Sequence, residues 1–419
     1  MPMSQAYKDR LFPVLDTIAS HYGTPFHIYD EAGIKDTGNS LKEAFADIKS
    51  FREYYAVKAL PNPRILGIMK EMGFGFDCSS IAELRLSRQV GGRGEEIMFT
   101  SNNTSELEFV EAAKDGGCIL NLDDLNLLAK VPNIPELICF RYNPGSKRTG
   151  NAIIGTPSEA KYGVSDDQIV DAYRQAKSKG VKKFGIHTML ASNELNYEYM
   201  VQTSRMLLDL VAKISDELKI TFEFINIGGG LGIPYEPGVA GLDLTAMGRE
   251  ITALFKNFSR QHGYEPALYM ESGRFITGPH GVLVTKAINR KNIYRTYVGV
   301  DASMSCLMRP GMYGAYHHID VVDKTENMES EIVDVVGSLC ENNDKFAVQR
   351  TLPKIEDGDI LVIQDTGAHG SAMGFNYNGN LRPKELLLSM DDTVELIRRA
   401  EKVEDYFATL CFEPESIAL

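Results

Sequence analysis

The sequence lacks several features that would place it in other protein classes. It holds no apolar run near the roughly 20 residues that span a bilayer. Its first residues, MPMSQAYKDRLFPVLDTIAS, lack the basic-then-apolar layout of a signal peptide. Basic residues are outnumbered, 44 against 57 acidic ones, which gives a net charge of −13. Because nucleic acids and anionic membranes bind basic surfaces, we expect neither as a partner.

Cysteine is also sparse, and it is not arranged in pairs. The 419 residues contain six cysteines and no CxxC motif. This pattern predicts the reduced thiols of a cytoplasmic protein, with no disulfide framework and no metal site. The remaining composition, 43% hydrophobic and 24% charged, is that of a globular protein, and the length predicts two domains.

Short apolar runs alternate with helical patterns between residues 31 and 280. The apolar residues of the helical patterns recur at spacings of three and four. Alternation of this kind predicts a parallel sheet, and eight units in one domain predict a closed (β/α)8 barrel. An open doubly wound sheet would need a glycine-rich turn after its first strand, where this chain has LPNP. The predicted strands are 54–59, 73–77, 96–100, 118–123, 136–143, 183–189, 221–228 and 267–272.

The pattern changes to β-rich from residue 281 to residue 419. Runs such as EIVDVVGS and DILVIQDTG are separated by glycine and proline, which predicts a second, β-rich domain. We expect residues 1–30 to belong to it, with FHIYD (26–30) adding a strand. No helix pattern follows the eighth barrel strand, so the helix at 31–48 is expected to close the ring. Residues 392–406 are predicted to form an exposed amphipathic helix.

Polar residues at the strand ends indicate the site, because active sites of such barrels lie at the carboxyl ends of the strands. Lys58 ends the first strand, where its stem could merely cover apolar surface. Asp77 ends the second strand. The glycines of IGGGLG (227–232) could bring backbone N–H groups close to a phosphate, although a flexible turn explains them as well.

Three further strand ends each have a functional and a structural explanation. Glu271 could contact a protonated ring nitrogen or form a salt bridge with Arg274. His187 could stack on a planar ligand, transfer a proton or simply pack. Arg141 could orient acidic residues or a phosphate, or form a structural ion pair. Together with Lys58, these groups are the parts of a pyridoxal 5'-phosphate (PLP) site, where a lysine anchors the cofactor and an acid contacts its ring nitrogen.

The ordered motifs of the chain resemble those of a known family, the fold-type III PLP-dependent decarboxylases. Among these, the sequence is most similar to the diaminopimelate decarboxylases, and the match covers nearly the whole chain. The motifs are YYAVKALPNP, GFDCSSIAEL, RYNPG, AKYG, NIGGGLGIPY, ESGRFITGPHGVLVTKA, LMRPGMYGAYHHI, GSLCENNDKF and DTGAHGSAMGFNYNGNLRP.

The resemblance implies an α/β barrel, a C-terminal β domain, and a homodimer with shared active sites. It implies that Cys340, as proton donor, and Glu341, as substrate ligand, come from the partner subunit. Arg274, Arg309 and Tyr313 would bind the distal carboxylate of the substrate. The strand-end residues and the family motifs together give the predicted cofactor residues, which are Lys58, Asp77, Arg141, His187, Gly228, Gly229, Gly230, Glu271 and Tyr377. The predicted catalytic residues are Lys58, Cys340 and His187, and Tyr377 is also expected to contact the substrate.

Four departures from the family pattern concern the site. The chain has ESGR where the family usually has EPGR, and it lacks the Gly-Ser that typically follows His187. Ser192 is the candidate to replace that serine as a phosphate contact. CENND stands for CESGD, which puts Asp344 out of step, and His369 stands where tyrosine is common.

The resemblance implies decarboxylation of meso-2,6-diaminopimelate to L-lysine and CO2, the last step of lysine biosynthesis. Alternatives are related decarboxylases that act on ornithine, arginine or carboxynorspermidine. A basic substrate tail favours an acid in the pocket, whereas Arg274 and Arg309 favour a carboxylate. A non-catalytic relative is expected to lose Lys58 or Cys340, and a racemase needs a second base, for which the sequence offers no clear candidate.

Overall fold

The computed structural model describes residues 3–150, 155–325, 327–414 and 417. The chain divides into two compact units. Ala32–Pro279 forms the first unit, and Pro2–Glu31 together with His280–Leu419 forms the second.

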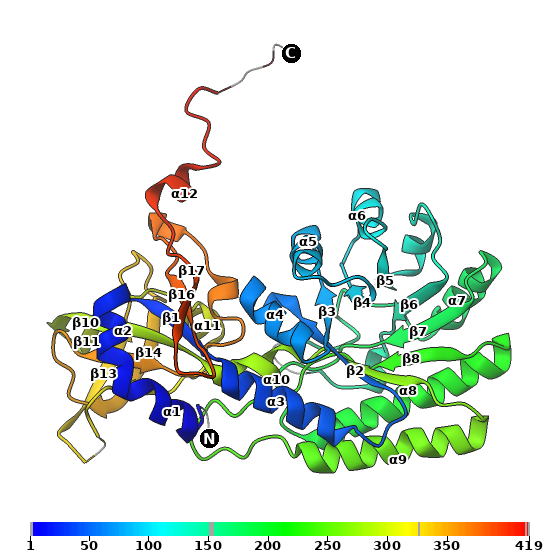
Figure 1. The fold of residues 1–419 in the computed structure, drawn as a ribbon, viewed down its shortest axis with the longest axis horizontal. Coiled ribbons are helices and arrows are strands. Elements are labelled where there is room, and N and C mark those ends of the chain that lie inside the picture. Colours follow the sequence, from blue (N-terminus) through cyan, green and yellow to red (C-terminus); the bar gives the residue numbers. More distant parts are fainter. Residues whose placement is uncertain (1–2, 151–154, 326, 415–416, 418–419) are drawn as a thin grey trace. The chain divides into compact units, whose positions relative to one another are not determined.

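The first unit contains a closed barrel of eight parallel strands (Figure 1). Each strand pairs with the next in chain order, and the first and last strands pair to close the ring. The barrel predicted from the alternating pattern is therefore confirmed. Its strands are β2 (Phe51–Ala56), β3 (Gly75–Cys78), β4 (Gly94–Phe99), β5 (Cys118–Leu122), β6 (Leu137–Arg141), β7 (Lys183–His187), β8 (Phe222–Asn226) and β9 (Ala267–Met270).

Helices surround the barrel strands. The helix predicted at 31–48 is α3, and its last turn packs so closely on α9 that a Cβ at Gly248 would lie 2.2 Å from the Ala44 carbonyl oxygen. No helix in the described ranges is long and apolar enough to cross a membrane. The helices are α3 (Glu31–Ala44), α4 (Pro63–Glu71), α5 (Ile81–Gln89), α6 (Glu106–Ala112), α7 (Ile169–Ser178), α8 (Tyr197–Leu218), α9 (Leu244–His262) and α10 (Gly273–Thr277), with 3-10 turns η2 (Val57–Ala59), η3 (Leu125–Ala129) and η4 (Gly145–Lys147).

Large apolar side chains fill the interior of the barrel. Phe224 reaches into it because β7 has a glycine opposite, and a Cβ at Gly185 would lie 2.1 Å from the Phe224 ring. A filled interior leaves the strand ends as the place for polar chemistry. The buried residues of this cluster are Tyr54, Met98, Ile119, Leu137, Cys139 and Phe224.

The second unit is built on a mixed sheet in the order β14-β13-β11-β10-β1-β16-β17. The predicted strand FHIYD is β1, which pairs antiparallel with β10 and parallel with β16. Strand β15 pairs with β10 and β12. The strands are β1 (Phe26–Asp30), β10 (Gly281–Asn292), β11 (Thr296–Val300), β12 (Ile319–Val321), β13 (Ser330–Val336), β14 (Lys345–Pro353), β15 (Ile360–Ile363), β16 (Lys384–Leu388) and β17 (Val394–Arg398).

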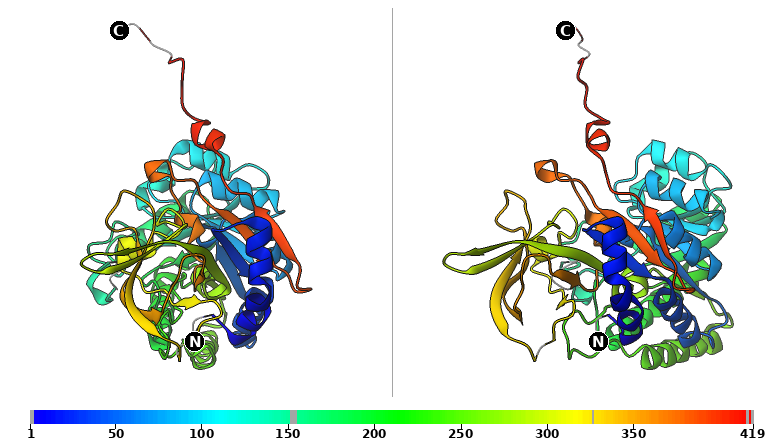
Figure 2. Two further views of the ribbon diagram at one scale, coloured as in Figure 1. Left: turned by 90° about the vertical axis from the view of Figure 1, so that its left-hand side faces the viewer. Right: turned by 60° about the vertical axis from the view of Figure 1, so that its left-hand side comes forward.

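Two apolar clusters stabilise this sheet. One lies among β10, β11, β13, β14 and β15, and the other joins β1, β10, β15 and β16 to the N-terminal helices. Figure 2 shows the long strands of the sheet, yellow-green to orange, curving around one another. The helices and turns of this unit are α1 (Gln5–Leu11), η1 (Phe12–Val14), α2 (Leu15–Tyr22), α11 (Arg309–Tyr313), η6 (Ser371–Met373), η7 (Tyr377–Gly379) and α12 (Val403–Phe407), and the turn η5 (Gly278–His280) spans the boundary with the first unit.

The prediction of an amphipathic helix at residues 392–406 is wrong. Residues Val394–Arg398 form strand β17, and only Val403–Phe407 form a short helix, α12. Strand β17 pairs antiparallel with β16, so that Leu396 lies opposite Leu386. Pairing with a neighbouring strand therefore overrides the helical spacing of this segment.

Candidate active site

Lys58 follows the first barrel strand. The sequence predicted Lys58 within the strand 54–59, but strand β2 ends at Ala56 and Lys58 lies in the turn η2 that follows it. Its side chain is half-exposed, and its Nζ lies 3.7 Å from Oδ2 of Asp77 in β3. The amine therefore lies at the carboxyl-terminal end of the barrel, beside a buried carboxyl group.

Glu271 follows β9 and is the centre of a buried hydrogen-bonded group. Its Oε2 lies 3.2 Å from Nε2 of His187, and its Oε1 accepts a hydrogen bond of 2.7 Å from Nδ2 of Asn226. All three side chains are buried. The described contacts thus pair Glu271 with residues of β7 and β8, and not with Arg274 as one sequence interpretation had it.

The two carboxyl groups of this site differ in their affinity for protons. Burial alone would raise the pKa of Glu271, but His187, Lys58 and Asn226 together lower it below the ordinary value. Burial and the charge of Glu271 raise the pKa of Asp77, and Lys58 only partly opposes this. Glu271 is therefore the group held as a carboxylate, as contact with a protonated ring nitrogen requires.

The glycines after β8 allow three close backbone approaches. A Cβ at Gly228, Gly229 or Gly230 would lie 2.1–2.4 Å from a carbonyl oxygen of the chain segments that follow β7 and β9. The Gly228 N–H donates to Oδ1 of Asn226 at 2.8 Å. Glycine is thus required here for packing, and the loop is held directly beside Glu271, whose own N–H donates to the Gly228 carbonyl oxygen.

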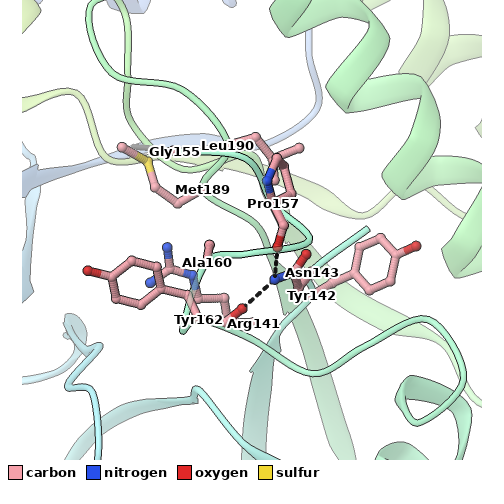
Figure 3. Close-up of a pocket in the computed structure, with 9 residues that line it drawn as sticks. All are labelled: Arg141, Tyr142, Asn143, Gly155, Pro157, Ala160, Tyr162, Met189 and Leu190. Carbon is pink, nitrogen blue, oxygen red and sulfur yellow. Dashed lines mark hydrogen bonds between the residues drawn. The ribbon is translucent and has the colours of Figure 1, made fainter. Parts of the chain in front are cut away.

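Arg141 ends β6 and is nearly buried. Its Nη1 lies 3.6 Å from Oδ1 of Asp123, and its guanidinium lies 4.4 Å from the centre of the Tyr162 ring. Figure 3 shows this stacking in a pocket after β6 and β7, where Asn143 donates to the carbonyl oxygens of Pro157 and Tyr162. Both sequence interpretations of Arg141 remain compatible with this geometry, since it forms an ion pair within a pocket.

Arg274 lies in α10 and is held by two neutral groups. Its Nη1 donates to the Tyr235 hydroxyl at 2.5 Å, and its Nη2 lies 3.5 Å from Oγ of Ser192. Among the described residues it has no carboxylate partner. The expectation that Ser192 contacts a phosphate stays a prediction, because in this structure its hydroxyl lies next to a guanidinium.

The other predicted substrate residues lie in the second unit. Arg309 begins helix α11, is buried, and donates to Nε2 of His317 at 3.0 Å. Tyr313 ends the same helix and is half-exposed. Gly311 between them packs so closely on the neighbouring loop that a Cβ there would lie 2.5 Å from the Asn343 carbonyl oxygen.

That neighbouring loop carries Cys340, whose thiol is free and exposed. The Cys340 N–H donates to Oδ1 of Asn378 at 2.7 Å, which joins the loop to the turn that contains Tyr377. Asp344 is buried at the base of the loop and accepts hydrogen bonds from the N–H groups of Met304 at 2.6 Å and Leu339 at 2.8 Å. The second unit thus brings the cysteine loop together with α11 and the tyrosine turn.

Three residues with a clear place at these sites were not predicted. Asn226 binds both Glu271 and the glycine loop, and its signal was an amide within the apolar strand FEFIN. Tyr235, which holds Arg274, follows the glycine loop without any polar pattern. Asp344 was noted only as out of step with the family spacing, whereas the structure shows it as the anchor of the Cys340 loop.

The barrel site fits PLP on its own chemistry. Oδ1 of Asp77 and Nδ1 of His187 are buried and have no hydrogen-bond partner among the described residues. Buried polar atoms normally have a partner, so these two indicate a polar ligand. A lysine amine, an ionised glutamate and a glycine loop complete a set that suits an aldehyde, a ring nitrogen and a phosphate.

Comparison with known proteins gives a consistent result. Residues 31–278 match the family model "Pyridoxal-dependent decarboxylase, pyridoxal binding domain". Protein TabA of Pseudomonas amygdali pv. tabaci is 46% identical over 417 residues, which cover 100% of this chain and 98% of that protein. Diaminopimelate decarboxylase of Methanothermobacter thermautotrophicus is 35% identical, with 93% of this chain and 92% of that protein covered.

A solved structure shows the same fold over both units. The structure of diaminopimelate decarboxylase from M. jannaschii in complex with L-lysine superimposes with a TM-score of 0.87 at 29% identity, covering 94% of this chain and 93% of that one. The family match therefore agrees with the barrel, with the β-rich unit and with a site whose residues suit PLP. The chain belongs to the fold-type III pyridoxal-dependent decarboxylases, and its cofactor is pyridoxal 5'-phosphate.

Proposed function

We propose that this protein decarboxylates meso-2,6-diaminopimelate to L-lysine and CO2, the last step of lysine biosynthesis. The relative from M. thermautotrophicus carries the name diaminopimelate decarboxylase, and the structural neighbour was crystallised with L-lysine. The name of the relative at 46% identity states no substrate. The substrate is therefore argued from the residues of this chain.

In this proposal the barrel residues hold the cofactor. Lys58 binds its aldehyde carbon through Nζ, the glycines 228–230 and Tyr377 bind its phosphate, and His187 lies against its ring. Glu271 accepts a hydrogen bond from the ring nitrogen, for which its lowered pKa prepares it. Bound in this way, the cofactor supplies an electron sink for the pair left when the substrate loses its carboxylate. Asp77 and Arg141 orient these groups from β3 and β6.

Cys340 and Glu341 act on the substrate in this proposal, in a homodimer whose active sites are shared. Sγ of Cys340 gives a proton to the carbon that has lost the carboxylate, and Glu341 binds the substrate. An exposed thiol on a short loop suits this role, because it is open to a second molecule. Arg309 and Tyr313, one helical turn apart on α11, bind the distal end of the substrate together with Arg274.

The observation that carries the choice of substrate is the setting of Arg274. Its described contacts are a phenol and a serine hydroxyl, which orient the guanidinium without neutralising it. A guanidinium has five N–H donors arranged to bind a carboxylate in a bidentate manner. Ornithine and arginine carry only a cation at their distal end, which this group repels, whereas the distal carbon of diaminopimelate carries a carboxylate beside its ammonium group.

The test is an assay of the purified protein with added PLP. Parallel reactions receive meso-diaminopimelate, ornithine, arginine or carboxynorspermidine, and products are measured by mass spectrometry. We expect lysine from the first reaction alone. Product from ornithine or arginine would overturn the argument from Arg274, and product from carboxynorspermidine alone would move the assignment to that substrate.

A variant sharpens the same test. Arg274→Gln keeps a side chain that can bind Tyr235 but removes the charge. We expect KM for diaminopimelate to rise by at least tenfold, because a charge-assisted bidentate contact is lost. Tyr235→Phe is the matched control, since it leaves the charge in place and removes only one hydrogen bond, and it should raise KM less. An unchanged KM in Arg274→Gln would contradict the proposed role.

A further inference from the structure

The strands that lead to Lys58 and to Glu271 meet at the point where the barrel closes. Strands β2 and β9 pair in parallel, and the last pair of their register is Glu53 opposite Met270. Beyond this pair the backbone ladder between the two strands ends. The two cofactor residues therefore lie on segments that main-chain hydrogen bonds no longer hold together.

A side chain continues the connection beyond the ladder. Oε1 of Glu53 accepts a hydrogen bond from the backbone N–H of Ser272, the residue after Glu271. Both residues are 1% exposed. Oε2 of Glu53 and Oγ of Ser272 have no partner among the described residues. Glu53 is thus a buried acid whose described contact is with the turn that carries Glu271.

The same turn packs tightly on the Lys58 segment. A Cβ at Gly273 would lie 2.7 Å from Cβ of Ala59 and 3.1 Å from Cβ of Ala56, on either side of Lys58. A small shift of the turn would open this contact. Whatever holds the Ser272 backbone in place therefore also sets how Glu271 and Lys58 face each other.

We propose that Glu53 is a positioning residue that fixes the turn 271–274 against the Lys58 segment through the Ser272 N–H. The proposal rests on the roles given above to Glu271 and Arg274. It also accounts for the departure of this chain from the family's EPGR pattern. A proline has no N–H and a fixed φ, whereas Ser272, at φ −91°, brings a buried N–H that needs an acceptor.

Three variants separate this role from ordinary burial. Glu53→Leu removes the acceptor and leaves the Ser272 N–H without one. Ser272→Pro removes the N–H and leaves the Glu53 carboxyl group without it. The double variant Glu53→Leu/Ser272→Pro removes both partners and restores the family's proline. Two groups in contact should show a non-additive result in such a cycle.

The main measurement is the affinity of the cofactor-free protein for PLP, by equilibrium dialysis, together with the visible absorption spectrum of the loaded protein. We expect each single variant to bind PLP roughly tenfold more weakly, because a buried group loses its partner. The double variant should return to within about threefold of the parent. We expect kcat to fall more than KM rises in Glu53→Leu, since the turn carries the ring-nitrogen contact.

Asp334→Leu is the control for buried acids in general. Asp334 lies in the second unit, is buried, and accepts the Gln349 N–H at 2.7 Å. This variant should lower the melting temperature and leave PLP affinity unchanged.

Glu53→Gln tests charge against hydrogen bonding, because its amide oxygen still accepts the N–H. We expect its PLP affinity to be closer to the parent than that of Glu53→Leu.

Three results would overturn the proposal: parent-like PLP affinity in Glu53→Leu, a double variant as weak as the weaker single variant, or a Glu53→Gln variant as weak as Glu53→Leu. If Glu53→Leu does not fold, a double variant that folds and binds PLP supports the proposal, and one that does not overturns it. The substrate is a separate question. Failure of the parent on diaminopimelate would leave these PLP measurements intact.

Discussion

The barrel and the second unit hold their candidate site residues in different ways. In the barrel, Asp77 and Glu271 are 1% and 7% exposed, and each lies at the end of a buried strand. In the second unit, Tyr313 and Tyr377 are 50% and 54% exposed, on a short helix and a turn. The first group is fixed by the strand order of the barrel. The second group depends on a few side-chain hydrogen bonds, such as those made by Asp344.

This difference suggests a division of work between the two regions. Residues on strand ends vary little in position, which suits a cofactor that stays bound through many turnovers. Residues on exposed loops can adjust to a substrate that enters and leaves. Changes at Lys58 or Glu271 in the barrel should therefore alter cofactor binding, whereas changes in the Cys340 loop of the second unit should alter turnover with the cofactor still in place.

Lys58→Ala is expected to have the largest effect. It removes the amine that binds the cofactor, so nearly all turnover should be lost. Borohydride treatment followed by mass spectrometry should find the cofactor attached to the parent protein at Lys58 and absent from the variant. Lys8→Ala, at a partly buried ion pair of the second unit, is the control for loss of a lysine elsewhere. Normal turnover in Lys58→Ala would contradict the placement of the site.

Cys340→Ala should come next and should separate the two regions. Loss of a proton donor typically reduces turnover by about 10²–10⁴-fold, while PLP affinity should stay near that of the parent. Cys411→Ala, also an exposed thiol, is the control. Mixing Lys58→Ala with Cys340→Ala subunits should restore up to about a quarter of the parent activity if the sites of a homodimer are shared. No recovery from subunits that exchange would contradict a shared site.

Asp344→Ala tests whether the loop depends on its buried anchor. Two N–H groups, of Met304 and Leu339, would lose their acceptor, at a cost of roughly 1–3 kcal/mol each. We expect turnover to fall by about tenfold or more with unchanged PLP affinity, as measured by steady-state kinetics and dialysis. Asp344→Asn keeps an acceptor and should lose less. A loss of PLP affinity in either variant would contradict the claim that the Cys340 loop acts on turnover and not on cofactor binding.

The fold could be predicted from the sequence because each barrel strand is a short apolar run bounded by glycine or polar residues. The prediction was wrong for 392–406, where pairing of β17 with β16 decides the structure and spacing alone does not show the partner. Helix α6, by contrast, starts at a local signal, because Ser105 caps it and forms a capping box with Glu108 three residues later.

The site could be predicted less completely than the fold. Lys58, His187 and Glu271 were singled out because each is polar at the end of an apolar strand, and the structure brings Glu271 into contact with His187. Asn226 was missed because an amide in a strand indicates little until the structure shows it between Glu271 and the glycine loop. Glu53 was missed for a related reason, since its contact with Ser272 joins two residues that are 219 positions apart in sequence.

The smallest expected effect concerns stability. It tests whether burial of the Asp77 carboxyl group at the barrel site lowers the free energy of unfolding. Burial, followed by the Glu271 charge, raises the pKa of Asp77 to about 7. The folded cofactor-free protein therefore binds this proton more tightly than the unfolded chain does. The stabilising contribution is present at low pH and is lost as the pH rises from about 4 towards 7. We compare the free energy of unfolding of Asp77→Asn with that of the parent at each pH. The difference should favour the variant more at pH 8 than at pH 5, by on the order of 1 kcal/mol.

Urea unfolding of the cofactor-free proteins at the two pH values measures this difference. Asp166→Asn is the opposite case, because the hydrogen bonds from Lys147 and Tyr142 lower the pKa of Asp166. Its contribution is already complete at pH 5, so that variant should lose a similar small amount at both pH values. If Asp77→Asn showed the same flat response, burial at the barrel mouth would carry no electrostatic cost. The contrast between a carboxyl group that burial destabilises as an anion, Asp77, and one that its partners stabilise, Asp166, would then fail.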